Sequence, residues 1–298
     1  MWLALAFTSA ILLGFYDVFK KQSLKDNAVL PVLFLNTVIC SLIFIPFIFL
    51  SSYTNVLDGT IVHVSSADWN THKYILLKSC IVLSSWIFGY FGMKHLPLTI
   101  VGPINATRPI MVLLGALLIF GEHLNIYQWT GVLLAIISFF LLSKSGKKEG
   151  INFKHDKWIY FIILAALLGA ISGLYDKYLM KRFDPMVVQA WYNIYQALIM
   201  CPILLFLWLP IRKKATPFKW KWTIVFISIF LSCADFAYFY ALSFDGSMVS
   251  IVSMIRRSSV VVSFLFGALV FHEKNLKSKA IDLILVLLSM IFLYFGTK

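Results

Sequence analysis

Charged side chains are scarce in this chain of 298 residues. Asp, Glu, Lys and Arg make up 13% of the sequence and hydrophobic residues 60%, whereas soluble domains contain about 25% charged residues. This balance excludes an ordinary soluble domain and predicts an integral membrane protein. The net charge of +13 would suggest nucleic acid binding in a soluble chain. Here, most Lys and Arg residues lie in short segments between apolar runs, where they set membrane orientation, so we expect no nucleic acid partner.

Cysteine is also rare. Cys40, Cys80, Cys201 and Cys233 all fall inside apolar runs, form no CxxC pair and have no histidine nearby in the sequence. This pattern disfavours a disulfide framework and a zinc site, and we expect all four to be packing residues. The six histidines lie in loops or at the ends of apolar runs, and none stands beside an evident nucleophile. The sequence therefore predicts neither a metal nor a cofactor, and it disfavours an enzyme.

Ten apolar runs are long enough to predict transmembrane helices, which need about 20 residues each. They are 2–19, 30–50, 74–93, 98–120, 126–143, 158–179, 186–209, 222–242, 247–271 and 279–295. The first run lacks the basic segment and the small-residue cleavage site of a signal peptide, so we expect it to remain in the membrane as a helix.

The second five runs repeat features of the first five in the same order. The matches are Gly14-Phe15-Tyr16-Asp17 with Gly173-Leu174-Tyr175-Asp176, Asn36 with Asn193, Phe88-Gly89-Tyr90-Phe91 with Phe236-Ala237-Tyr238-Phe239, Arg108 with Arg256, and Gly121-Glu122 with His272-Glu273. We predict a first five-helix repeat over 1–143, a polar linker over 144–157 and a second repeat over 158–298. An odd number of spans makes the second repeat enter the bilayer from the opposite side, which gives an all-α fold of two inverted repeats.

Inverted repeats predict a solute site at mid-depth between the halves, where helices are interrupted. Pro103 and Pro109 predict an interruption in the fourth run, and the Ser-rich segment 256–259 predicts one in the ninth. We expect further interruptions at Gly14 and Gly173, although Gly173 also belongs to a small-residue face suited to close helix packing.

Arginine inside a membrane span is costly, by about 2.5–3.5 kcal/mol at a helix centre, and generally faces a cavity or the protein interior. The deepest charges are Arg108, Asp235, Arg256 and Arg257. If Asp235 neutralises one arginine, the site keeps a positive excess that favours a carboxylate or phosphate. Adjacent residues on a helix point about 100° apart, so we do not expect Arg256 and Arg257 both to face the cavity squarely. The alternative is that the arginines are interhelical locks.

Other candidate binding residues are aromatic or polar groups within the spans. They are Tyr16, Asp17, Tyr175, Asp176, Asn36, Asn193 and Trp86. Each has a structural alternative: Asp17 can pair with Lys20 or Lys21, the asparagines can join helices, and the aromatic rings can form the core. Any of the membrane carboxylates could carry a coupling proton. Lys78 is expected to extend to the lipid headgroups.

The ten spans, the five-helix duplication and the Pro109-x12-Glu122 spacing resemble EamA-type members of the drug/metabolite transporter superfamily. The resemblance implies a multi-pass transporter in a cell membrane, the inner membrane in a bacterium, with a small-molecule substrate and the lipid bilayer as partners. Superfamily substrates include amino acids, quaternary amines, nucleotide sugars and phosphorylated sugars. A lipid flippase of the same fold remains an alternative, and a membrane-embedded transferase a weaker one. The sequence leaves the oligomeric state open and is compatible with a monomer.

The charge count and the family resemblance give opposite expectations for the membrane orientation. One side of the predicted topology carries 17 Lys and Arg residues, and the side that holds both termini carries five. Because cytoplasmic loops are enriched in these residues, the count predicts both termini outside, whereas the family resemblance implies both inside. We adopt the charge count, since it is a property of this chain.

Overall fold

The computed structural model describes residues 2–108, 110–111, 125–147, 151, 153–244, 252, 255–271 and 276–296. All regular structure in these ranges is helical. In a bilayer an α-helix satisfies its backbone hydrogen bonds within the segment, so this all-helical architecture suits the apolar composition.

The helices of the first half of the chain are α1 (Trp2–Leu24), α2 (Val29–Tyr53), α3 (Trp69–His95), α4 (Leu98–Ala106) and α6 (Ile126–Lys147). Those of the second half are α7 (Lys157–Met180), α8 (Pro185–Ile203), α9 (Thr223–Ser243), α11 (Ser259–Leu269) and α12 (Leu276–Phe295). A π-helical segment (Leu204–Trp208) and a 3₁₀ turn (Leu209–Ile211) extend α8. Six of the described helices are long and apolar enough to cross a membrane: α1, α2, α3, α7, α8 with its extension, and α9.

The third helix begins earlier than the sequence suggested. The expected apolar run began at residue 74, but α3 starts at Trp69 because Asp68 caps it. The Asp68 carboxylate accepts a hydrogen bond from the Thr71 backbone N–H at 2.9 Å and another from the Thr71 hydroxyl, as a helix N-cap residue does. These hydrogen bonds from Thr71 lower the pKa of Asp68.

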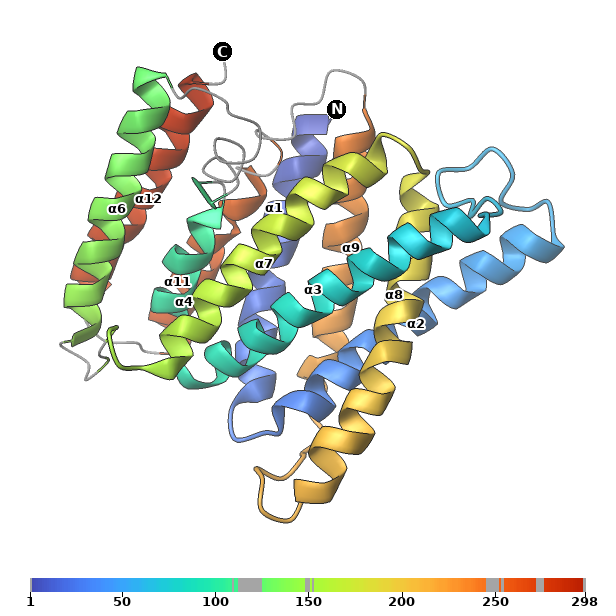
Figure 1. Ribbon diagram of the computed structural model, residues 1–298, viewed down its shortest axis with the longest axis horizontal. Helices are drawn as coiled ribbons and strands as arrows, with labels where there is room; N and C mark the ends of the chain where they lie inside the picture. The colour runs from blue at the N-terminus through green and yellow to red at the C-terminus, as the bar shows by residue number, and fades with distance from the viewer. Residues whose placement is uncertain are drawn as a thin grey trace.

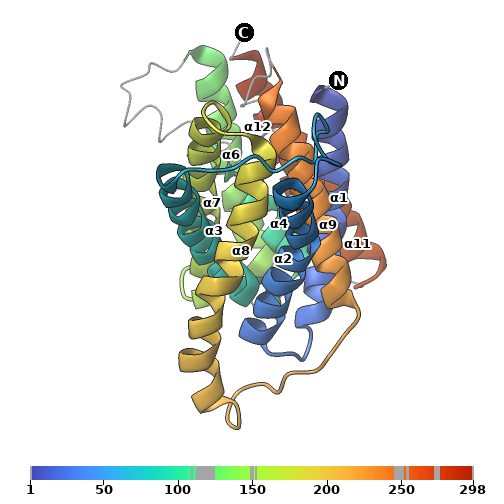
Figure 2. The ribbon, with the colours of Figure 1, turned by 90° about the vertical axis from the view of Figure 1, so that its right-hand side faces the viewer.

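Helices of the two halves pack against each other in matched pairs. Helix α1 packs on α9, and α3 packs on α7. Helix α2 also packs on α8, α4 on α11, and α6 on α12. The α6–α12 pair forms one edge of the bundle (Figure 1), and α1 begins at the same end of the bundle at which α12 finishes (Figures 1 and 2).

Serine hydroxyls join these helices by donating to backbone carbonyls of the partner helix. Ser9 donates to the Ala234 carbonyl at 2.6 Å, and Ser85 donates to the Ala165 carbonyl at 2.7 Å. Small polar residues of this kind let helix backbones approach closely within a membrane. The packing of α1 on α9 and of α3 on α7 is therefore reinforced in each case by a serine hydrogen bond.

Two of the expected helix interruptions are present and two are not. Helix α4 ends in a turn at Thr107, and a turn at Ser258 precedes α11. Pro109 itself lies outside the described residues. Helices α1 and α7 run unbroken through Gly14 and Gly173, so these two expectations were wrong. At Gly14 the glycine permits close packing instead, because an added Cβ would lie 2.5 Å from Cβ of Val262.

Candidate functional site

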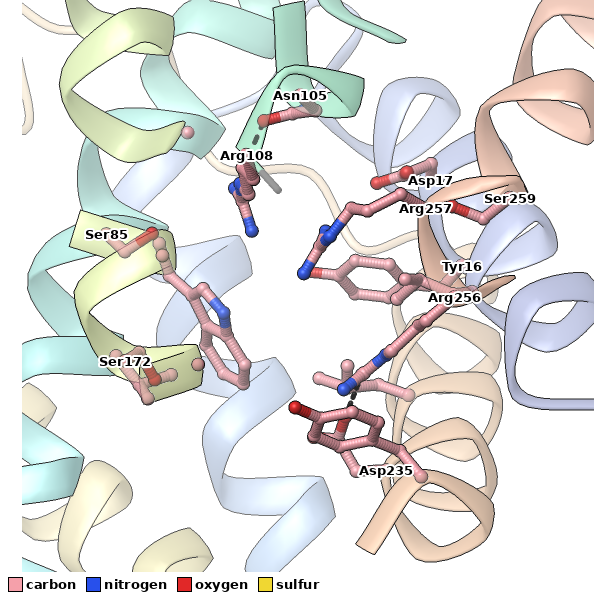
Figure 3. A pocket seen from close by; sticks show the side chains of 18 of the residues that line it. Tyr16, Asp17, Ser85, Asn105, Arg108, Ser172, Asp235, Arg256, Arg257 and Ser259 are labelled. Carbon is pink, nitrogen blue, oxygen red and sulfur yellow. Dashed lines mark hydrogen bonds and ion pairs between the residues drawn. The ribbon is translucent and has the colours of Figure 1, made fainter. Parts of the chain in front are cut away.

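A cavity of about 130 Å³ lies between the two halves. Helices α1, α3 and α4 line it from the first half, and α7, α8, α9 and α11 line it from the second. Arg108 follows the turn that ends α4, and Arg256 and Arg257 precede the turn that starts α11. The two helix breaks therefore direct long cationic side chains into the same space (Figure 3).

Each of the three carboxylates in the described cavity wall is engaged by one cation. Lys20 Nζ lies 2.7 Å from Asp17 Oδ1 within α1. Lys78 of α3 pairs with Asp176 of α7, and Arg256 pairs with Asp235 of α9. Asp235 also accepts a hydrogen bond from the Tyr192 hydroxyl at 2.6 Å, so both of its oxygens are occupied. These pairs satisfy the buried charges that would otherwise be costly in a membrane.

Lys78 does not extend to the headgroups, and that expectation was wrong. Only 2% of its surface is exposed. Its ammonium group lies 5.1 Å from the centroid of the Tyr192 ring and 4.9 Å from that of Phe239. Lys78 can be buried because Asp176 is itself buried opposite it. A paired buried charge avoids the cost of an isolated one.

Arg108 and Arg257 line the cavity without a carboxylate partner among the described residues. Arg108 donates from Nη2 to Asn105 Oδ1 at 3.1 Å, while its buried Nε has no hydrogen-bond acceptor in the described part of the chain. Arg257 forms no ion pair with a carboxylate in the part of the chain that the structure describes. The cavity wall therefore carries a positive excess at these two side chains.

Arg256 and Arg257 both line the cavity, and their side chains extend in different directions (Figure 3). Arg256 turns toward Asp235 and stacks on the Tyr238 ring, with 4.1 Å between its guanidinium carbon and the ring centroid. Arg257 reaches toward the side of the cavity near Tyr16 (Figure 3). Two long side chains that leave the helix at different angles can thus enter opposite sides of one cavity.

The structure brings eight of the eleven candidate binding residues into the cavity wall. They are Tyr16, Asp17, Trp86, Arg108, Asp176, Asp235, Arg256 and Arg257. The other three lie elsewhere. The Tyr175 hydroxyl donates to the Tyr74 carbonyl at 3.2 Å, Asn36 accepts from the Ser228 hydroxyl at 3.0 Å, and Asn193 donates to the Gln189 carbonyl at 2.8 Å. These contacts fit structural roles between and within helices.

Sequence reasoning missed Lys20 and Lys78 as cavity residues, because each was given a role at the membrane boundary. The signal that could have identified Lys78 is its position five residues into the apolar run that begins at Tyr74. The cysteines also differ from expectation: Cys40 is buried, but Cys80, Cys201 and Cys233 are exposed on the protein surface and are not packing residues. Among the described residues, no cluster of His, Cys, Asp or Glu could hold a metal ion.

The long apolar helices and the polar cavity enclosed by them define a multi-pass helical membrane protein. The EamA-like transporter family matches residues 1–144 and 156–295, and the chain belongs to that family. An uncharacterized transporter of Archaeoglobus fulgidus is 23% identical over 204 residues. The match covers 67% of this chain and 66% of that relative. This chain therefore spans just under two thirds of the relative's length.

A solved structure, described only as the crystal structure of a protein, is similar in fold. Its TM-score is 0.64 at 13% sequence identity, and the alignment covers 99% of this chain and 96% of that one. At this identity the likeness shows the fold alone. The family match places the chain in a family of transporters, and its own function is proposed below from the cavity.

Proposed function

We propose that this protein moves a small anionic metabolite, which bears a carboxylate or a phosphate, across a membrane by alternating access. The observation that carries the proposal is the positive excess of a cavity formed jointly by both halves. Arg108 comes from the first half and Arg257 from the second, and neither has a carboxylate partner among the residues that the structure describes. A guanidinium group binds carboxylates and phosphates through paired hydrogen bonds.

Alternating access requires two units that can move against each other around the site, and several observations support two inverted five-helix units. The contacts of α1 with α9 are mirrored by those of α7 with α3. The helix breaks at Thr107 and Ser258 fall beside the arginines that match in the sequence repeat. The family match leaves out residues 145–155, which fall inside the proposed linker of 144–157. In transporters built from inverted repeats, rocking of one repeat against the other exposes the site to each side in turn.

A coupling proton is part of this proposal, and Asp17 is the best-placed carboxylate to carry it. Its side chain is 18% exposed, compared with 8% for Asp176 and 9% for Asp235. Asp17 also pairs with a lysine of its own helix, whereas the other two carboxylates join different segments. Protonation of Asp17 would therefore disturb helix packing least.

Transport by purified protein in liposomes tests the proposal. The panel contains dicarboxylates, organic phosphates, amino acids, quaternary amines and labelled phospholipids, and protein-free liposomes are the blank. We expect uptake of one or more anions that falls at least about tenfold in an Arg108→Gln variant, because a charged hydrogen bond is lost. Uptake confined to amines would contradict the anionic substrate, and movement of phospholipids alone would favour the flippase.

A further inference from the structure

Each carboxylate of the described cavity wall can be assigned to one cation. The described wall contains five cationic side chains, Lys20, Lys78, Arg108, Arg256 and Arg257, and three carboxylates, Asp17, Asp176 and Asp235. Each carboxylate is paired with a different cation, and the pairs take up both lysines and Arg256. With all three carboxylates ionised, two positive charges of the described wall, on Arg108 and Arg257, are left for a ligand to neutralise.

Both remaining guanidinium groups are positioned for a shared ligand. They come from different halves and extend into the same space from opposite walls (Figure 3). Arg108 is fixed by its hydrogen bond to Asn105 and by close contact with Gly169. Its Nε is buried and has no acceptor among the described residues. A buried donor without a partner is costly to leave unsatisfied.

We propose, resting on the anion transport proposed above, that the cavity selects an oxyanion with two negative charges, a phosphate monoester or a dicarboxylate, which bridges Arg108 and Arg257. A dianion neutralises both guanidinium groups when the cavity closes around it. A monoanion leaves one uncompensated cation in a site of low dielectric, where an unpaired charge is strongly disfavoured. A zwitterion leaves both charges uncompensated.

Ligand binding to the purified protein tests the preference for a dianion directly. The ligands are compared in pairs of nearly equal size. The pairs are succinate with succinamate and glycerol 3-phosphate with its methyl ester, at about pH 8, where a phosphate monoester is dianionic because its second pKa is about 6. We expect at least one dianion to bind about tenfold or more tightly than its monoanionic partner. The pair that shows the larger ratio distinguishes phosphate from dicarboxylate.

Two variants test whether the cavity causes the preference for a dianion. We expect Arg257→Gln to lower the ratio of dianion to monoanion affinity to about threefold or less, since one of the two charged hydrogen-bonding partners is gone. Arg212→Gln removes an arginine that is exposed in a loop and should retain the ratio of the unmodified protein. An unchanged ratio in Arg257→Gln would overturn the proposed bridge, and the unmodified protein remains informative if a variant does not fold.

The outcomes separate this inference from the proposed function. Equal binding of the two members of each pair, together with liposome uptake of monoanions, would reject the preference for a dianion. It would not contradict anion transport. Binding of neither member, together with uptake of amines or lipids, would reject both.

Discussion

The guanidinium group of Arg108 lies directly against the backbone of Gly169 in α7. A Cβ atom added at Gly169 would lie 2.6 Å from Nη1 of Arg108 and 2.7 Å from its Cζ. Both distances are shorter than real contacts allow, so Arg108 can occupy its observed place only opposite a glycine. The glycine at this position in α7 therefore admits a charged side chain.

Gly169→Ala should therefore reduce transport by displacing Arg108, while the protein remains folded. We expect a loss of about tenfold in uptake, comparable to the loss of a charged hydrogen bond. The matched control is Gly173→Ala, in the same helix and the same cavity wall, where an added Cβ meets nothing within 4 Å. Equal uptake by the two variants would argue against a positioning role for Gly169.

Arg256 and Arg257 are adjacent but should differ in their effect on stability. Arg256→Gln leaves the buried Asp235 without its cation, and removal of one partner of a buried pair costs about 3–5 kcal/mol. Arg257→Gln removes a cation that pairs with no carboxylate among the described residues, so the ligand-free protein should become more stable. Thermal unfolding of both variants in detergent checks this. A loss of stability in both would indicate that Arg257 is also an interhelical lock.

Lys78 and Asp176 form a lock between α3 and α7, which a double-mutant cycle can measure. Lys78→Met and Asp176→Leu should each destabilise the protein by about 3 kcal/mol or more, because each leaves one buried charge unpaired. The double variant should lose much less than the sum, since an apolar pair can replace a buried ion pair. Additive losses in unfolding by denaturing detergent would show that the two side chains are not coupled.

Asp17→Asn tests the proposed coupling proton. Uptake by the unmodified protein should acidify the liposome lumen, as reported by an enclosed pH-sensitive dye, and the variant should take up solute without that acidification. Asp26→Asn is the control, because Asp26 is exposed in the turn between α1 and α2. Proton movement that persists in Asp17→Asn would remove Asp17 from this role.

Membrane orientation can be decided by labelling single cysteines. In a variant whose exposed Cys80, Cys201 and Cys233 are replaced by alanine, Thr60→Cys should react with an impermeant reagent added outside intact cells. Lys154→Cys should react only after permeabilisation. Both positions are exposed in described loops. The reverse pattern would place both termini inside and overturn the orientation expected from the charge count.

The sequence alone predicted the class of protein and much of the cavity wall. Arg108 and Arg256 could be identified because a guanidinium group inside an apolar run is too costly to face lipid, and the structure places both in the cavity wall. Tyr16 and Asp17 could be identified because they recur in the repeated motif. The same motif failed at Tyr175: Asp176 enters the cavity, whereas the Tyr175 hydroxyl donates to the Tyr74 carbonyl.

What the sequence determined by itself was the apolar composition, the order of its long apolar runs and the presence of buried cations, since these depend on residue type and spacing. Only the tertiary structure decided which cation each carboxylate neutralises. Lys78 and Asp176 are 98 residues apart, and no local pattern specifies that they meet across α3 and α7. Because the free charge of the cavity is what remains after such long-range pairs form, the proposed preference for a dianion could be inferred only from the folded chain.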